Sequence, residues 1–303
     1  MPIDYRPAVT NAAAAGTWVL GDQRVNRMGF GSMRLTVDPD PHVAVRVLRR
    51  AVDLGVEHVD TAAFYFSPGG ILDVGDGPAR YATELIRRAL SPYGERLLIA
   101  TKVGPGILAD GRWGEARTAG ELRKQVEENL RRLGVERLDL VNLRVFRSAD
   151  SIAERFAALA DMRAEGLIRH LGLSAVRVEQ LDEALAIAPV ACVQNSYALD
   201  LRHNDEMLRV CGERGIAFVP FFAIAGPGKE SGASAEQNAV IEAVAARHGA
   251  TAHQVRLAWT LHQGEHVLAI PGTGSERHLA ENVAAGAIRL TESDLSELFA
   301  VRP

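Results

Sequence analysis

Two charged side chains end apolar segments that are typical of buried strands, and a phenol follows one of them. Asp60 and Lys102 are these two residues, and Tyr65 comes five residues after Asp60. Charges in such places are almost always paired. A cation close to a phenol stabilises the phenolate and lowers the phenol pKa from its ordinary value of about 10. We therefore expect Lys102 to lower the pKa of Tyr65, and Asp60 to keep the lysine charged and in position.

A phenol of this kind is a general acid that protonates an oxygen as that oxygen gains negative charge. The reaction that suits it is hydride delivery to a carbonyl. No metal-ligand cluster accompanies these residues in the sequence, so we expect the hydride to come from a nicotinamide. Two alternatives stay open. Asp60 can be a structural ion-pair partner or a helix cap, and the spacing of His58 and Asp60 is the one feature that favours a metal-dependent barrel hydrolase. We expect His58 and His170 to be packed residues.

The elements that must position these residues follow from hydrophobic periodicity. Strand-like apolar runs occupy residues 26–33, 56–60, 96–102, 138–145, 168–174, 189–197, 216–222 and 266–272. Helical patterns occupy residues 42–55, 79–94, 118–135, 148–167, 177–188, 203–215, two stretches within 234–264, and 275–286. Eight alternating units in about 300 residues predict a (β/α)8 TIM barrel with parallel strands and outer helices. A doubly wound open sheet is the alternative, but it predicts a G-x-G-x-x-G turn, and "GFGSM" lacks the third glycine.

The ends of the chain complete this expected architecture. Residues 17–25 predict a β-hairpin that caps the barrel bottom, with Gly21 and Asp22 at its turn. We expect residues 1–303 to form a single barrel domain, with residues 1–15 as a flexible tail.

Composition excludes several classes of partner. The chain has 303 residues, of which 47% are hydrophobic and 24% are charged, and its formal net charge is −4. This balance gives no electrostatic reason to expect nucleic acid or an anionic membrane as a partner. No apolar run reaches the roughly 18 residues of a membrane span. Cys192 and Cys211 lie in apolar segments and are expected to be buried and reduced. The start of the chain lacks the pattern of a secretory signal, so a cytoplasmic location is expected.

In a barrel, the active site lies at the carboxyl ends of the strands. The side chains expected to converge there are Asp60, Tyr65, Lys102, Asn142, Leu143, Arg144, Ser174, Gln194, Asn195 and Phe221. Phe222, by contrast, is expected to lie in the core.

Asp60, Tyr65 and Lys102, in this order and at these strand ends, resemble three of the four catalytic residues of the aldo-keto reductases. The segments "LGLSAV", "CVQNSY", "VPFFAIAG" and "AIPGTGSERHLAEN" occur where that family has its cofactor-contacting motifs. The resemblance covers nearly the whole chain, and within the family it is closest in wording to bacterial pyridoxal reductases. It implies a reductase of aldehydes or ketones, with pyridoxal as the sharpest expectation for the substrate. NADPH is favoured as the cofactor, and NADH is possible.

The resemblance also implies a role for each matching residue. Tyr65 is the proton donor, Lys102 and Asp60 tune it, and Arg144 stands at the fourth catalytic position. Ser174 and Gln194 are expected to bind the carboxamide of the cofactor, and Phe221 is expected to lie under the nicotinamide ring. At the adenosine phosphate end the expected residues are Thr273, Ser275 and His278, with the helix start near Glu276. At the adenine they are Glu281 and Asn282.

The sequence departs from the family pattern at several positions. Arg144 replaces the usual His, and Ala175 replaces an Asn that usually follows Ser174. Phe66 replaces a Gly after the catalytic Tyr, and a long insertion to residue 79 follows it. Gly272 and His278 stand where a Lys and an Arg usually clamp the 2′-phosphate of NADP.

These departures support an alternative function, a nicotinamide-binding barrel with little activity that serves as a regulatory or binding protein. For the enzyme, we expect a small-molecule carbonyl substrate as the partner. The protein itself is expected to be a monomer or a weak homo-oligomer.

Overall fold

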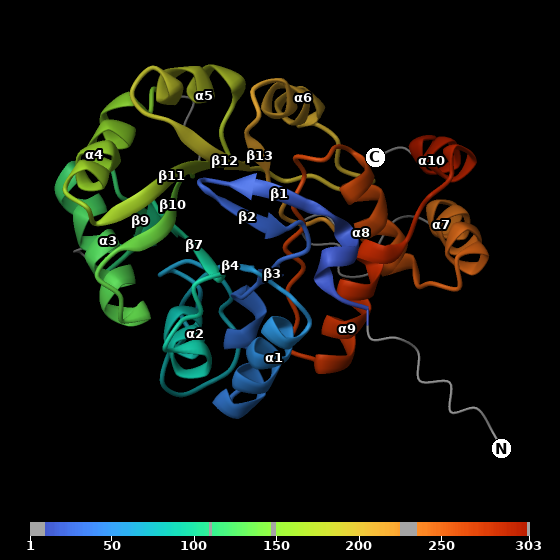
Figure 1. Ribbon diagram of the computed structural model, residues 1–303. Helices are drawn as coiled ribbons and strands as arrows, with labels where there is room; N and C mark the ends of the chain where they lie inside the picture. Colours follow the sequence, from blue (N-terminus) through green and yellow to red (C-terminus); the bar gives the residue numbers. More distant parts are fainter. Residues whose placement is uncertain (1–9, 109–110, 147–149, 225–234, 302–303) are drawn as a thin grey trace.

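The computed structural model describes residues 10–108, 111–146, 150–224 and 235–301. Seven parallel strands form one sheet in the order β13-β12-β11-β10-β7-β4-β3, curled into a barrel with helices outside (Figure 1). Their bounds are β3 (Phe30–Gly31), β4 (His58–Asp60), β7 (Leu98–Val103), β10 (Leu138–Arg144), β11 (Ile168–Ser174), β12 (Val190–Gln194) and β13 (Ala217–Phe218).

The eighth run closes the barrel without forming a continuous strand. Val267 makes a parallel bridge to Phe218, and Ala269 makes one to Met28. The segment therefore pairs with β13 on one side and with the residues just before β3 on the other. We expected a strand over residues 266–272, and the pairing is limited to these bridges. Its far end carries Pro271, which has no N–H to donate to a sheet. The (β/α)8 barrel is confirmed.

Local signals fix the helix ends. Asp40 caps the first helix through its side chain, and Pro41 takes the first helical position. Thr118 and Glu121 form a capping box on the third helix, and Gly134 ends that helix in the left-handed conformation. The helices are α1 (Pro41–Asp53), α2 (Ala82–Leu90), α3 (Ala119–Leu133), α4 (Ala153–Ala164), α5 (Val178–Leu185), α6 (Asp205–Glu213), α7 (Ala235–Arg247), α8 (Ala252–His262), α9 (Glu276–Ala284) and α10 (Glu292–Phe299).

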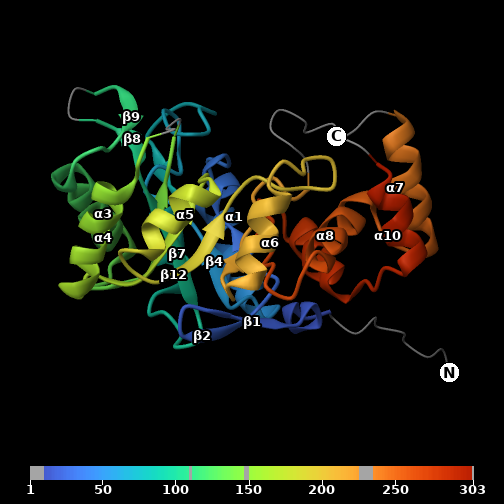
Figure 2. The same cartoon turned by 90° about the horizontal axis from the view of Figure 1, so that it is seen from above.

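The N-terminal hairpin closes one end of the barrel, as expected. It consists of β1 (Thr17–Leu20) and β2 (Gln23–Asn26), and it crosses the barrel axis in Figure 1 and lies at its lower end in Figure 2. Leu20 and Val25 are fully buried against the apolar residues that fill the barrel interior. Asp22 at the turn accepts a hydrogen bond from His170 at 2.8 Å, which ties the turn to β11. His170 thus has a structural contact with the hairpin turn, which agrees with the expectation that it is a packed residue.

The prediction of a flexible tail over residues 1–15 is wrong for residues 11–15. Ala12–Ala15 form a short 3-10 helix capped by the side chain of Asn11, and Ala12 and Ala15 are buried. The backbone N–H of Ala12 donates to the carbonyl of Leu54 at 2.8 Å. Alanine has no side chain large enough to reveal this packing in a sequence pattern, although it fits against a helix end. Residues 1–9 lie outside the described part of the chain.

Two short hairpins rise at the other end of the barrel, and sequence periodicity did not reveal them. The strands β5 (Phe66–Ser67) and β6 (Arg80–Tyr81) pair across the 66–79 insertion, and β8 (Pro105–Ile107) pairs with β9 (Trp113–Glu115). Figure 2 shows β8 and β9 at the end opposite to β1 and β2. Cys192 and Cys211 are both free and buried, as expected. Within the described residues, no helix is long and apolar enough to cross a membrane.

Candidate active site

A buried ion pair lies at the carboxyl end of two neighbouring strands. Lys102 Nζ donates to both carboxylate oxygens of Asp60 at 2.7 Å, and to the carbonyl oxygen of Thr61 at 3.1 Å. Both side chains are almost fully buried. Burial lowers the pKa of Lys102, and the charge of Asp60 raises it. The raising effects outweigh burial, so the net pKa lies above the ordinary value. Lys102 is therefore held as a cation, as the sequence predicts.

Tyr65 lies beside this pair. Lys102 Nζ is 4.6 Å from the centre of its ring, and the ring of Phe64 packs edge-on against it at 5.3 Å. Burial of the phenol raises the pKa of Tyr65, and the charge of Lys102 opposes this. The net pKa is raised, so the expectation that Lys102 brings it below the ordinary value is wrong. Desolvation of the phenolate outweighs the nearby cation, and the negative charge of Asp60 raises the pKa further.

Arg144 completes the cluster from the end of β10. Its Nη1 donates to Ser174 Oγ at 3.0 Å, and its guanidinium lies over the ring of Phe221, with Cζ 4.6 Å from the ring centre. Burial lowers the pKa of Arg144, and the nearby Tyr65 and Asp60 oppose this. An arginine stays charged in proteins. No carboxylate of the described residues forms a direct ion pair with it, and Asp60 acts on it only from a distance.

Gln194 joins the ion pair to the neighbouring strand. Its Nε2 donates to Asp60 Oδ1 at 2.7 Å, while its Oε1 is buried without a hydrogen-bond partner among the described residues. A carboxylate only accepts hydrogen bonds, so this contact fixes which way the amide points. The unpartnered Oε1 is thus available to accept a hydrogen bond from a ligand. An amide N–H2 is such a donor, so this orphaned oxygen fits the nicotinamide carboxamide expected there.

The segment after β11 adopts a conformation that the sequence does not favour. Ala175 has a φ of 57°, in the left-handed region. Residues other than glycine, asparagine and aspartate are strained in this conformation. The next strand end is held firmly, because Asn195 accepts from the backbone N–H of Val176 and donates to its carbonyl oxygen. Asn195 is therefore a structural clamp, and Ser174 is left as the polar side chain beside Arg144.

The residues expected at the phosphate end gather at the start of α9. Ser275 caps this helix, and its hydroxyl accepts from the backbone N–H of His278 at 3.4 Å. Thr273 Oγ1 accepts from the backbone N–H of Ser275 at 3.1 Å. Glu281 pairs with Arg277 at 2.7 Å, and Asn282 is buried. Caps and ion pairs thus already use several of these groups, and a helix start still favours an anion.

Close packing of the backbone explains why position 272 is a glycine. A Cβ atom there would lie 2.5 Å from the carbonyl oxygen of Gly31. The closing segment and β3 therefore approach too closely for the lysine that the family pattern has at this position. Arg277 donates to Glu281 and to the ring of His278.

The insertion after Tyr65 is anchored at both ends. Phe66 stacks on Tyr81 with 4.8 Å between the ring centres, and Ser67 Oγ lies 3.0 Å from Thr36 Oγ1. Of the two aromatic residues after β13 (Ala217–Phe218), Phe221 lies beside Arg144 as expected, and Phe222 is not where the sequence places it. Phe222 is 39% exposed and has a φ of 65°, so the expectation that it lies in the core is wrong. Its ring packs edge-on against Phe221, and a left-handed backbone turns it outward.

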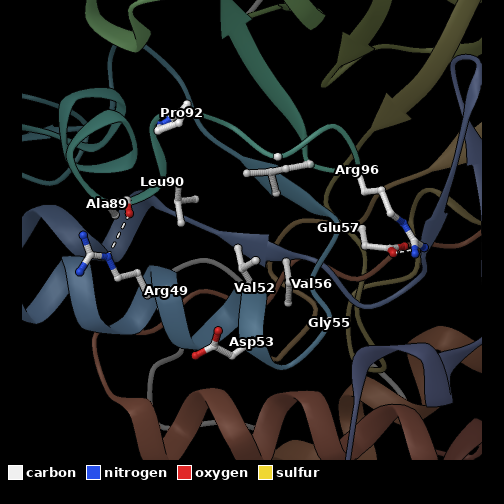
Figure 3. A pocket seen from close by; sticks show the side chains of 12 residues that line it. Arg49, Val52, Asp53, Gly55, Val56, Glu57, Ala89, Leu90, Pro92 and Arg96 are labelled. Carbon is white, nitrogen blue, oxygen red and sulfur yellow. Dashed lines mark hydrogen bonds and ion pairs between the residues drawn. The ribbon is translucent and has the colours of Figure 1, made fainter.

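Two clefts differ in their relation to this cluster. A cleft of about 390 Å³ reaches Lys102 between the β8–β9 hairpin, α3 and Phe64. A larger one, of about 560 Å³, lies between the ends of α1 and α2. Figure 3 shows that Arg49 and Arg96 there already contact Ala89 and Glu57. The larger cleft adjoins none of the residues of the cluster, and the smaller one adjoins it at Lys102.

Sequence reasoning missed two aromatic residues beside the phenol. Phe64 packs on Tyr65, and Trp113 of β9 packs edge-on against Phe64 at 6.3 Å. Phe64 stands next to Tyr65 in the sequence, which was an available signal. Trp113 lies far away in the chain, and only the β8–β9 hairpin brings it to the mouth. The hydrogen bond between Gln194 and Asp60 was also missed, because the two residues are far apart in the chain and only the fold brings them together.

In the described residues, no group of three or more metal-ligating side chains is present.

A curled parallel barrel with a buried lysine–carboxylate pair and a phenol at its mouth is the architecture of a carbonyl oxidoreductase, and comparison with known sequences agrees. The sequence model of the Aldo/keto reductase family matches residues 27–302. The chain belongs to this family and is an oxidoreductase. Pyridoxine 4-dehydrogenase of Escherichia coli is 41% identical over 297 residues, covering 94% of this chain and 98% of that protein. An uncharacterized oxidoreductase of Schizosaccharomyces pombe is 37% identical, covering 97% of this chain and 90% of its own.

Solved structures share the fold. A thermostable aldo-keto reductase in complex with the inhibitor epalrestat has a TM-score of 0.78 and 28% identity, and covers 94% of this chain and 99% of its own. An aldo-keto reductase of Klebsiella pneumoniae in complex with NADPH has a TM-score of 0.77 and 26% identity, and covers 96% of this chain and 94% of its own. Another structure from that organism contains NADP and acetate, with a TM-score of 0.76 and 26% identity over 93% of each chain.

Proposed function

We propose that this protein reduces an aldehyde or ketone to an alcohol with NADPH, and that Tyr65 donates the proton. The observation that carries the proposal is the contact of Lys102 with both Asp60 and the ring of Tyr65. When bound, the nicotinamide supplies the hydride to the carbonyl carbon. The phenol then gives its proton to the carbonyl oxygen, and the Lys102 cation stabilises the phenolate that remains.

The other residues of the cluster have positioning roles in this proposal. Gln194 Oε1 and Ser174 would accept from the carboxamide and fix which face of the ring points to the substrate. Phe221 would lie under the ring, and Arg144 would donate to the carbonyl oxygen as it gains negative charge. Thr273, Ser275, His278, Glu281 and Asn282 would hold the adenosine end, where the start of α9 favours phosphate.

Pyridoxal is the substrate that we propose within this class, because the Escherichia coli relative is a pyridoxine dehydrogenase. NADPH is the proposed cofactor because the Klebsiella pneumoniae structures contain NADP and NADPH. Gly272 cannot be replaced by the lysine of the family pattern without a backbone shift, so we expect the preference over NADH to be modest.

The test is an equilibrium titration with NADPH and with NADH, followed by turnover of pyridoxal. We expect one-to-one binding, and we expect Tyr65→Phe to reduce turnover by about 100-fold or more while the dissociation constant for NADPH stays the same. Unchanged turnover in Tyr65→Phe would exclude the phenol as proton donor. Binding without turnover of any carbonyl compound would favour a regulatory protein, and no binding at millimolar cofactor would refute the nicotinamide site.

A further inference from the structure

The charges of the cluster do not balance. Lys102 and Arg144 are cations, and Asp60 is the one anion that contacts either of them among the described residues. Tyr65 is neutral at ordinary pH, because a phenol has an ordinary pKa of about 10 and burial raises it. Two positive charges and one negative charge leave one positive charge at the barrel mouth. Both oxygens of Asp60 already accept from Lys102, and Oδ1 also accepts from Gln194. Asp60 therefore has little capacity left to accept a hydrogen bond from Arg144.

Arg144 holds this surplus charge close to Tyr65, the proposed proton donor. Its Nη1 bonds to Ser174, and its guanidinium is held over the ring of Phe221. These two contacts fix the plane of the group. A guanidinium presents its remaining N–H groups as a rigid fork, which matches two oxygens at once, whereas a histidine ring offers one donor in a given direction. A reduced nicotinamide ring carries no charge that would neutralise the fork.

We propose that Arg144 determines specificity, and that the preferred substrate carries an anionic oxygen within chelating distance of the carbonyl that is reduced. An ionised phenol ortho to an aldehyde has this chemistry, and so does the carboxylate of an α-keto acid. The inference rests on the proposed reductase function and adds the substrate class. In the reaction, the carbonyl carbon gains the hydride and its oxygen gains the proton of Tyr65, while the neighbouring anionic oxygen stays bound to Arg144 and does not react.

The aromatic surroundings favour the ionised phenol over the keto acid. Phe64 packs against Tyr65, Trp113 packs against Phe64, and Phe221 lies under Arg144. Aromatic rings beside the phenol and beside Arg144 suit a flat aryl substrate. The two sources of the anionic oxygen are separated by the test.

The experiment compares matched pairs of substrates with NADPH at neutral pH. The first pair is 2-hydroxy-5-nitrobenzaldehyde, whose nitro group makes the phenol ionise readily, and 2-methoxy-5-nitrobenzaldehyde, which cannot ionise. The second pair is phenylglyoxylate and its methyl ester. Because a hydrogen bond to a charged group is strong, we expect kcat/KM to be about 10- to 100-fold higher for an ionised member than for its neutral partner. Preference in the first pair identifies the phenolate, and preference in the second identifies the carboxylate.

Variants of Arg144 then assign the effect. In Arg144→Gln we expect kcat/KM to fall for both aldehydes and the ratio between them to approach one. Arg144→Lys keeps the charge but loses the fork, so it should retain only part of the ratio. Titration with NADPH and the thermal midpoint check that each variant folds. A ratio that stays high in Arg144→Gln would overturn the assignment.

A pH profile of the unmodified protein keeps the inference testable if the variants are inactive. With salicylaldehyde, the parent ortho-hydroxy aldehyde, KM should fall as the pH rises through the pKa of the substrate phenol. For the nitro compound the inflection should move to lower pH, and for the methoxy compound it should be absent. Equal kcat/KM within both pairs, with turnover of all four compounds, would overturn the substrate class and leave the reductase function standing. If pyridoxal is reduced but none of the four compounds is, the substrate class is overturned, and if pyridoxal is not reduced with NADPH or NADH either, both proposals are refuted.

Discussion

Burial and the charge of Lys102 oppose each other in setting the pKa of Tyr65. Burial of the phenol raises it, and the charge of Lys102 lowers it without cancelling the effect of burial. A raised pKa favours the protonated phenol. This is no obstacle to reduction, because the alkoxide that forms on the substrate is a much stronger base than a phenolate. It is an obstacle to alcohol oxidation, which needs the phenolate as the base.

The two directions of the reaction should therefore depend on pH in opposite ways. Because the phenol stays protonated below its raised pKa, we expect kcat/KM for carbonyl reduction to be flat through neutral pH and to fall only above about pH 10. For alcohol oxidation with NADP, kcat/KM should rise with pH over the same range as phenolate forms. Both profiles are measured with a substrate that does not ionise, such as a methoxybenzaldehyde and its alcohol. A fall in the rate of reduction between pH 6 and pH 8 would contradict this account of Tyr65.

Ala175 offers a second test at the scale of one residue. Its φ of 57° is unfavourable for alanine by roughly 1–2 kcal/mol. Asparagine tolerates this conformation, and its amide would stand beside Ser174, where the family pattern has one. We expect Ala175→Asn to raise the thermal midpoint and to lower the dissociation constant of NADPH by up to about 10-fold, the value of one hydrogen bond.

Ala175→Gly is the matched control for this change. Glycine relieves the same strain, but its greater freedom in the unfolded chain costs about 0.5–1 kcal/mol, so the gain in stability should be small. It adds no amide, so the affinity for NADPH should not change. Tighter binding in Ala175→Gly as well would show that backbone strain, and not a new hydrogen bond, controls the cofactor site.

At the scale of elements, Glu115 ties the β8–β9 hairpin to the end of β10. Its Oε1 accepts from the backbone N–H of Phe146 at 2.8 Å and from Arg155 of α4 at 2.7 Å. Phe146 lies two residues after Arg144, so this contact fixes the segment that leaves the site. The side chains of Glu115 and Arg155 are 7% and 8% exposed. Removing one partner of such a pair leaves a buried charge without compensation.

We expect Glu115→Gln to lower the free energy of unfolding by roughly 3–5 kcal/mol and to raise KM for the carbonyl substrate. The double variant with Arg155→Met should lose less stability than the sum of the single losses, because it removes both charges. Chemical denaturation measures each free energy. Arg117→Met is the control, since Arg117 is 66% exposed and lies 3.7 Å from Glu115, so its loss should cost about 1 kcal/mol at most. Additive losses in the double variant would show that the pair is not coupled.

The elements that the sequence predicted share one property, which is that their signals are local. The long helices and the buried strands repeat apolar residues at fixed spacing, and the caps at Asp40 and Thr118 mark their starts. The β5–β6 and β8–β9 hairpins have strands of two or three residues, too short for any period to appear. The contact of Gln194 with Asp60 and the raised pKa of Tyr65 depend on distance and burial in space, which no local pattern contains.

At the scale of the whole molecule, the barrel separates stability from chemistry. The β1–β2 hairpin lies at one end (Figure 2), where it packs on the apolar filling, and the charged cluster lies at the carboxyl ends of the strands. Leu98 and Leu140 belong to the same apolar cluster as Leu20 and Val25 of the hairpin, and they stand on the same strands as Lys102 and Arg144 but closer to their amino ends. A change at the bottom of the barrel can thus alter the free energy of unfolding while the strand ends keep their arrangement.

Leu20 tests this separation, because its exposed fraction is 1% and it packs into the barrel bottom. We expect Leu20→Ala to lower the free energy of unfolding by about 2–5 kcal/mol through the cavity that it leaves, with kcat and KM close to those of the unmodified protein. Val19→Ala in the same strand is the matched control, since Val19 is 41% exposed and its truncation should change stability by about 0.5 kcal/mol at most. Denaturation curves and steady-state kinetics at a temperature where both variants are folded decide the question. A large fall in kcat for folded Leu20→Ala would mean that the hairpin controls the positions of Asp60 and Lys102 through the barrel interior, and the two ends would then have to be treated as one coupled unit.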